Sequence, residues 1–268
     1  MAIWTTAPIA SQATGAGVAE TAETTFQAPS SAVELVAVKG HAFATQGDPA
    51  EPIFGVFKLK GQDWKHNPYE WFSEIGAPKV GAIDQVAYSF SPRWWPAHLP
   101  VRPSAQYSIT YEPLSALANN GQYNIDLKWS TKKTGQAPIL RLCSRESLST
   151  AQLAVLSITG AKRVTSYGGG YTAETVAADD PSSARLALTS AGLDEIQTVS
   201  FNFNFIHTIE ATTGVAYTAL TVIEADIPVK AVGGDPLVFS SAITVDVALG
   251  TAGTYAYFIE YEPRAVMS

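Results

Sequence analysis

Apolar and polar residues alternate strictly in two stretches of the chain. In residues 122–130, QYNIDLKWS, every odd position is apolar and every even position is polar. Residues 199–205, VSFNFNF, repeat this pattern with three phenylalanines on the apolar side. Successive side chains of a strand point to opposite faces, whereas a helix would mix the two sets. The alternation therefore predicts β-strands with one dry and one wet face.

The same reasoning predicts further strands separated by turns. They are expected at about 33–45, 52–60, 82–91, 105–112, 137–143, 153–159, 171–177, 184–189, 215–227, 237–249 and 254–262. Turn-forming clusters such as GDP at 47–49 and NNG at 119–121 separate most of them. Only 113–118 and 146–156 offer short helices. We therefore predict an all-β fold with short helices in the connections.

The inner faces of these strands supply the expected core. The core candidates are Tyr123, Ile125, Leu127, Trp129, Phe201, Phe203, Phe205, Ile243, Val245, Val247, Tyr257, Ile259 and Tyr261. Alternation requires all members of one face to be buried together.

One strand pattern occurs twice. Residues 107–113, YSITYEP, reappear 150 positions later as YFIEYEP at 257–263, and a weaker similarity relates 32–38 to 192–198. A length of 268 residues accommodates two cores. We therefore predict a duplicated unit, with two tandem antiparallel β-sandwiches at 31–145 and 146–268. Residues 1–30, rich in Ala, Thr, Ser and Gly, are expected to form an extended N-terminal arm that pairs late in folding or with a neighbouring molecule.

Composition narrows the function. Charged residues make up only 15% of the chain, the net charge is −7, and no block of like charges occurs, which disfavours nucleic-acid binding. The pattern predicts neither a signal peptide nor a membrane-spanning segment. Cys143 is the single cysteine, so an intramolecular disulfide cannot form. This favours assembly in a reducing cytosol, with a mature exported form as the alternative.

Residue patterns typical of catalysis or metal binding are absent. The sequence has no Gly-x-Ser-x-Gly, His-Glu-x-x-His, Walker or Cys-x-x-Cys motif, and its four histidines are scattered. We therefore predict no metal, no cofactor and no catalytic residue. Glu260 and Glu262 share one strand face at a spacing of roughly 7 Å, which a glycosidase pair could use. A solvated face or a contact between subunits is the preferred explanation, and the glycine run 168–170 is interpreted as a turn.

Two aromatic segments, 63–72 and 92–98, are interpreted as long loops between strands. Their candidate contact residues are Trp64, Trp71, Trp94 and Trp95. Tryptophan beside polar groups can stack on sugar rings or form the centre of a protein interface. It can also simply pack beneath the sandwich, and these three alternatives remain open.

The low charge, the alanine- and threonine-rich arm and the paired strands 107–113 and 257–263 resemble the jelly-roll major capsid proteins of tailless icosahedral DNA viruses of bacteria or archaea, the double jelly-roll lineage. The resemblance implies two eight-stranded jelly rolls in one chain. It also implies homotrimers that form pseudo-hexagonal capsomers. A single jelly roll with a long insertion remains the alternative.

The function expected from this resemblance is that of a structural viral capsid protein, located in the virion and assembled in the host cytoplasm. Its partners would be copies of itself and minor capsid or penton proteins, and contact with an internal membrane is left open. The alternatives are a carbohydrate-binding or adhesin-like sandwich that uses the tryptophan segments, and a glycoside hydrolase or lyase on a sandwich.

Overall fold

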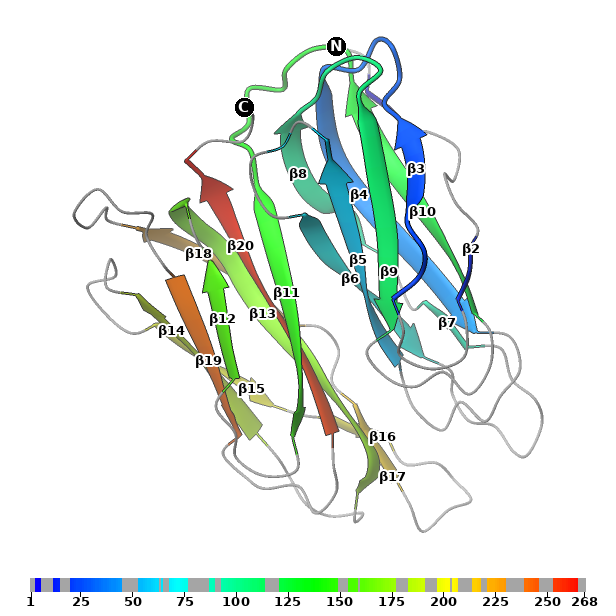
Figure 1. Cartoon of the computed structure of the whole chain (residues 1–268). Helices are drawn as coiled ribbons and strands as arrows, with labels where there is room; N and C mark the ends of the chain where they lie inside the picture. The colour runs from blue at the N-terminus through cyan, green and yellow to red at the C-terminus, as the bar shows by residue number, and fades with distance from the viewer. Residues whose placement is uncertain are drawn as a thin grey trace.

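The computed structural model contains strands as its only regular elements among the residues it describes (Figure 1). Those residues are 3–5, 12–14, 20–44, 53–62, 64, 68–76, 87–89, 93–113, 121–148, 154–158, 160–176, 183–190, 197–202, 204–206, 214–217, 221–229, 239–245 and 253–264. The predicted all-β class is confirmed. Across this part of the chain, no helix has the length and apolar character needed to span a membrane.

Ten strands from the first half of the chain form one antiparallel sheet. They are β1 (Ile3–Thr5), β2 (Gln12–Thr14), β3 (Thr24–Gln27), β4 (Glu34–Ala44), β5 (Ile53–Gly61), β6 (Tyr69–Gly76), β7 (Ala87–Ser89), β8 (Trp95–Pro100), β9 (Gln106–Pro113) and β10 (Gly121–Ser130). The order is β1-β10-β4-β7-β6-β5-β9-β3, with β2 also on β10 and β8 also on β4. This sheet is called the first unit below.

The first unit folds over into two layers that face each other. Short β7 joins β4 to β6, and aromatic rings then meet across the interior. The Phe57 ring of β5 lies 5.5 Å from the Tyr123 ring of β10, and Tyr107 of β9 lies 6.0 Å from Trp129 of β10. The layer of β4, β8 and β10 therefore packs on the layer of β5, β6 and β9 as a β-sandwich.

The second half of the chain forms two further antiparallel sheets, called the second unit below. One contains β11 (Leu140–Leu148), β13 (Ala161–Val176), β16 (Asn204–Ile206), β17 (Gly214–Tyr217), β18 (Thr221–Pro228) and β20 (Gly253–Pro263). The other contains β12 (Ala154–Ile158), β14 (Ser183–Ser190), β15 (Gln197–Asn202) and β19 (Phe239–Val245). In Figure 1 the sheet with β11, β13 and β20 lies between this four-stranded sheet and the first unit.

The sheets divide the chain at residues 131–139, which link β10 to β11. Position 145/146, given as the boundary between the two predicted sandwiches, lies within β11, and the two-sandwich division stays a prediction. Both members of the repeated strand lie in the interior of a sheet, β9 between β3 and β5, and β20 between β11 and β13. The jelly-roll topology of each unit stays a prediction.

Several segments differ from their expected structure. The expected arm contributes β1 and β2 to the edge of β10 and β3 to β9, so these strands pair within their own chain. The aromatic segments predicted as loops contain strands β6 and β8. The helix expected at 146–156 is replaced at its two ends by β11 and β12. The helix expected at 113–118 stays untested, because residues 114–118 lie outside the described residues.

The predicted core of β10 is confirmed, because Tyr123, Ile125, Leu127 and Trp129 are all fully buried. In β20 the odd face of Tyr257, Ile259 and Tyr261 is buried as predicted. The even face, with Phe258, Glu260 and Glu262, is buried as well. The remaining core candidates in 201–205 and 243–247 lie outside the described side chains.

Glycine at position 40 allows the two layers of the first unit to approach each other. A Cβ atom there would lie 2.2 Å from Cε2 of Phe57 and 2.8 Å from Nε1 of Trp71. These two rings are stacked, with centroids 5.1 Å apart. The backbone of β4 therefore forms one wall of the aromatic core.

We predict that Gly40→Ala lowers the free energy of unfolding by about 3 kcal/mol, because the added methyl group forces the rings to move. In a Phe57→Leu background, which frees space, the same change is expected to cost less. Urea unfolding of the four proteins in this double-mutant cycle measures both costs. Equal costs in the two backgrounds would rule out the steric explanation.

Candidate functional site

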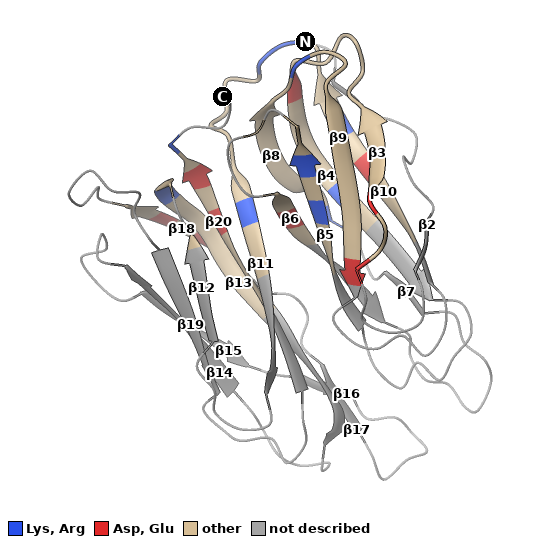
Figure 2. Cartoon of the chain, in the orientation of Figure 1, with Lys and Arg blue, Asp and Glu red and all other residues tan. Residues whose placement is uncertain are grey.

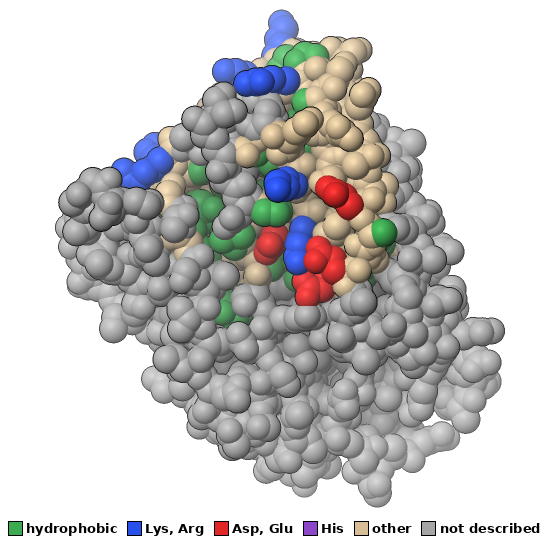
Figure 3. Space-filling view, viewed as in Figure 1, with side chains coloured by type: hydrophobic (Ala, Val, Ile, Leu, Met, Phe, Trp, Pro, Cys, Tyr) green, Lys and Arg blue, Asp and Glu red, His purple; other side chains and the backbone are tan. Residues whose placement is uncertain are grey.

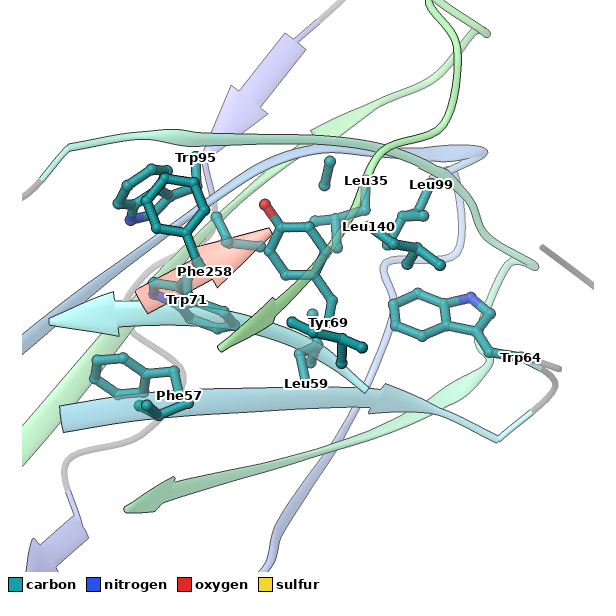
Figure 4. Packing of buried hydrophobic residues seen from close by; sticks show 14 of the residues in the cluster. Leu35, Phe57, Leu59, Trp64, Tyr69, Trp71, Trp95, Leu99, Leu140 and Phe258 are labelled. Atoms are coloured by element: carbon teal, nitrogen blue, oxygen red, sulfur yellow. The ribbon is translucent and has the colours of Figure 1, made fainter. Parts of the chain in front are cut away.

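The two units meet along strand β8, at what is called the seam below. The Trp95 ring at the start of β8 lies edge-on to the Phe258 ring of β20, with centroids 5.6 Å apart (Figure 4). The next residue, Pro96, accepts a hydrogen bond of 2.6 Å from the Tyr69 hydroxyl of β6. Buried residues from both units form one continuous hydrophobic cluster, so the seam is an interior of the protein.

A second backbone contact fixes the linker to the seam. The amide of Ile139 donates a hydrogen bond of 2.8 Å to the carbonyl of Ala97 in β8. Strand β11, which follows directly, packs against β6. The edges of the first sandwich, β8 in one layer and β6 in the other, are therefore closed by the sheet of the second unit.

A buried arginine lies at the centre of the seam. Arg141 of β11 is 1% exposed, and its guanidinium carbon lies 3.6 Å from the Trp95 ring centroid and 4.6 Å from that of Phe258. Its Nη2 donates a hydrogen bond to Oε2 of Glu260. Burial lowers the pKa of Arg141 to about 10. Nε and Nη1 have no hydrogen-bond partner in the described part of the chain, and the aromatic faces supply cation–π attraction to the guanidinium group.

Glu260 and Glu262 share a strand face as predicted, but that face is not solvated. Glu260 is 5% exposed and also accepts a hydrogen bond from Thr165. Glu262 accepts a bond of 2.6 Å from Nζ of Lys162 and lies 3.4 Å from Nη2 of Arg163. Each carboxylate is therefore held by cations, and neither is available as the free acid or base that glycosidase chemistry requires.

The four candidate tryptophans occupy different environments. Trp64, Trp71 and Trp95 are buried, and Trp64 lies edge-on to Tyr107 with centroids 5.4 Å apart. This burial supports the packing alternative for these three, because their rings are covered by the chain itself. Trp94 is half-buried on the outer side of the first unit. Its ring lies 4.3 Å from Nζ of Lys128 and 4.8 Å from Nζ of Lys39.

Charged groups gather beside the seam on strands β5, β6 and β9 (Figures 2 and 3). Nζ of Lys58 lies 2.8 Å from Glu112 and 3.4 Å from Glu20. Burial would lower the pKa of Lys58, but the pairing with Glu112 outweighs it and raises that pKa. Nearby, Oε2 of Glu70 accepts a bond of 2.8 Å from the amide of Cys143.

Burial controls the ionisation of Glu70 and Cys143. It raises the pKa of Glu70 to about 7, although the bond from the Cys143 amide opposes the shift. It also raises the pKa of the Cys143 thiol well above its usual value. The thiol is therefore protonated at neutral pH and is a poor nucleophile. Among the described residues, no group of three His, Cys, Asp or Glu side chains could hold a metal ion.

The sequence analysis named Trp95 and Glu260 of the seam but missed Arg141, Tyr69 and Glu70. Arg141 stands between two leucines in β11, and its alternation alone would place it in solvent. Tyr69 and Glu70 lie in a segment that was interpreted as a loop. A charged residue on the polar side of a strand carries no local signal that a second sheet will cover it.

Comparison with protein-family models finds no match, and comparison with curated proteins finds none either. Solved structures of low similarity include a chain of the Sulfolobus Turreted Icosahedral Virus (9% identity, TM-score 0.48, covering 97% of this chain and 90% of that one). The STIV MCP has 10% identity and a TM-score of 0.44, with 97% of both chains covered. A third, PNGF-II, has 7% identity and a TM-score of 0.46, covering 91% of this chain and 59% of that one. Because all three TM-scores are below 0.5, the function rests on the residues of the chain itself.

We predict that Arg141→Met lowers the free energy of unfolding by about 3–5 kcal/mol, because it leaves the Glu260 carboxylate buried without its cation. The double variant Arg141→Met/Glu260→Leu is expected to recover most of this loss. Arg163→Met is the matched control, since Arg163 is 41% exposed and its ion pairs contribute about 1 kcal/mol or less. Urea unfolding measures all three. A double variant as unstable as the single one would contradict this role for the pair.

We also predict that the protein loses stability as pH rises from about 4.5 to about 7. In this window the unfolded chain releases the Glu70 proton while the folded chain retains it, so higher pH favours unfolding. Glu70→Gln stays neutral and should be more stable than the parent protein at pH 8, by about 1–3 kcal/mol.

Thermal unfolding of both proteins from pH 4 to pH 8 checks this prediction. The difference between them should vanish below about pH 4, where the carboxyl group is protonated in both states. A difference that is constant across the whole range would show that burial does not control this group.

Proposed function

We propose that this chain is a structural protein that assembles into the shell of a virus. The observation that carries the proposal is the seam, where Arg141, Glu260 and the surrounding aromatic rings join two all-β units into one continuous body. The charged side chains there, which could otherwise act in catalysis, pair with each other inside the protein. A rigid double unit is the kind of element that a shell needs, because lateral contacts between copies must keep a constant geometry.

Composition supports the same function. A chain with 15% charged residues and a net charge of −7 has no overall positive charge that would attract the enclosed nucleic acid. The resemblance of the repeated strand pattern to double jelly-roll capsid proteins adds the finer proposal. In this finer proposal, three chains form a pseudo-hexagonal capsomer. Capsomers then form an icosahedral shell together with minor or penton proteins, and this assembly takes place in the host cytoplasm.

The glycan-binding alternative would depend on Trp94. The other three candidate tryptophans are buried within the chain, whereas Trp94 keeps part of its ring accessible between two lysines. A sugar ring stacked on Trp94 would have to displace at least one of these ammonium groups. Trp94 could equally lie in a contact between copies, where arginine and aromatic side chains often concentrate binding energy.

We predict that the purified protein forms trimers and, at higher concentration, regular shells. Light scattering should give a mass of about three times 28.5 kDa for the first species, and electron microscopy should show rosettes or closed particles. Contacts between copies should bury more than about 2,000 Å² if the assembly is obligate.

Trp94→Ala separates the two functions. It should leave glycan-array binding at background level, as in the parent protein, and alter assembly only if Trp94 lies in a contact between copies. A protein that stays monomeric at every concentration, salt and pH tested, and that loses glycan binding with Trp94→Ala, would overturn the shell function.

A further inference from the structure

Strand β8 contains a bulge that is held in an unusual backbone conformation. In its pairing with β4, Leu99 lies opposite Leu35, whereas Pro96 lies opposite Ala37. Two residues of β8, Ala97 and His98, therefore oppose a single residue of β4. His98 has a φ of +48°, which is rare for a residue with a side chain. Such bulges re-aim a side chain, and the strain persists only where other contacts hold it.

The contacts that hold His98 come from a buried carboxylate. Nδ1 of His98 lies 2.9 Å from Oε1 of Glu34, the first residue of β4, and 3.1 Å from Oγ1 of Thr134. Glu34 is only 4% exposed. It accepts two further hydrogen bonds from Thr134, one of 2.6 Å from the amide and one of 2.5 Å from the hydroxyl.

These bonds keep Glu34 charged in spite of its burial. Burial by itself would raise the pKa of Glu34, but the bonds from Thr134 and His98 outweigh it and place that pKa below its ordinary value. A carboxylate binds N–H and O–H donors about twice as strongly as a neutral acceptor does. The buried charge and its donors therefore form one cooperative group.

Thr134 belongs to the linker, residues 131–139, that joins the two units. Its neighbours Lys132, Lys133, Gly135 and Gln136 are exposed. The linker is tied to the first unit at Thr134 and again at Ile139, whose amide bonds to the carbonyl of Ala97. A local pair of bonds also joins Lys132 to the Ser130 hydroxyl at the end of β10, whereas the ties at Thr134 and Ile139 end on the bulge of β8 or on its partner Glu34. The bulge thus connects the path of the linker with the seam that begins at Trp95.

We propose that Glu34, His98 and Thr134 form a clamp that locks the inter-unit linker and holds the two units in one fixed orientation. When the clamp is closed, the linker cannot lift from β8, and the carbonyl of Ala97 stays aimed at Ile139. When it opens, the strain at His98 is released, the linker detaches, and the seam loses its support at that end. The clamp does not depend on the shell function, since any role that needs a rigid double unit would use it.

Limited trypsin digestion of the full-length protein tests the clamp. Lys132 and Lys133 are exposed, but a protease needs the linker to detach before it can bind an extended segment there. Thr134→Val removes the hydrogen bond from the Thr134 hydroxyl to Glu34. It should raise the rate of cutting after Lys132 or Lys133 about 10-fold. Glu34→Gln should raise it about 10- to 100-fold, because it weakens all the bonds to the carboxylate.

Matched controls separate the clamp from general loosening. Thr165→Val removes a hydroxyl bond to Glu260, and Glu112→Gln removes a carboxylate that pairs with Lys58 of β5, so neither change touches a contact of the linker. Both should leave the linker cutting rate unchanged. Mass spectrometry identifies the cut, and circular dichroism shows that each variant is folded.

Two results would overturn the clamp. One is a parental cutting rate in Thr134→Val and Glu34→Gln, and the other is equal acceleration in the two controls. If Glu34→Gln does not fold, Thr134→Val with its Thr165→Val control decides the question, because Thr134 is only half-buried. Shell assembly and digestion test different proposals. If a clamp variant still forms shells, the shell function is supported, and the digestion rate alone decides whether the clamp exists.

Discussion

The contact of the Arg141 guanidinium with the rings of Trp95 and Phe258, together with its ion pair to Glu260, is the interaction on which the arrangement of the two units depends. A guanidinium group that is 1% exposed must have a countercharge, since its hydration is lost. Arg141 and Glu260 lie directly opposite each other in the pairing of β11 with β20, so the ladder itself brings them together. The aromatic ring of Trp95 then covers this pair from the first unit. Register within the second unit and docking between the units are thus set by one group of side chains.

This arrangement explains why a few charged residues of the described chain are buried. Glu34, Glu260 and Arg141 are all buried, and each is engaged with a partner that spans strands or units. A buried ion pair contributes modestly to stability, but the cost of mispairing it is large, which favours a single arrangement. Side chains used in this way fix the relative arrangement of strands and units. That use agrees with the proposed role as a rigid element in a shell.

The predictions from sequence succeeded where one strand face could be judged from neighbouring residues. Strict alternation identified the core of β10 and the odd face of β20. The same reasoning assigned Glu260 and Glu262 to a solvated face or to a contact between subunits, because it has no means of detecting a second sheet of the same chain on the polar side. It also interpreted Trp71 and Trp95 as loop residues, since proline and charged neighbours interrupt their alternation. Both residues lie in or at the start of strands whose rings pack into the core.

The sequence by itself determined the all-β class and the approximate positions of most strands. These follow from local rules, because the direction of a side chain in a strand depends on its position relative to its immediate neighbours. Only the tertiary structure decided that β20 is buried on both faces, that β1, β2 and β3 pair within the chain, and that Glu34 reaches Thr134. Glu34 and Thr134 are 100 residues apart, and Arg141 and Glu260 are 119 apart. Such contacts depend on how whole sheets dock, and hydrophobic alternation along one strand carries no information about the sheet that will cover it.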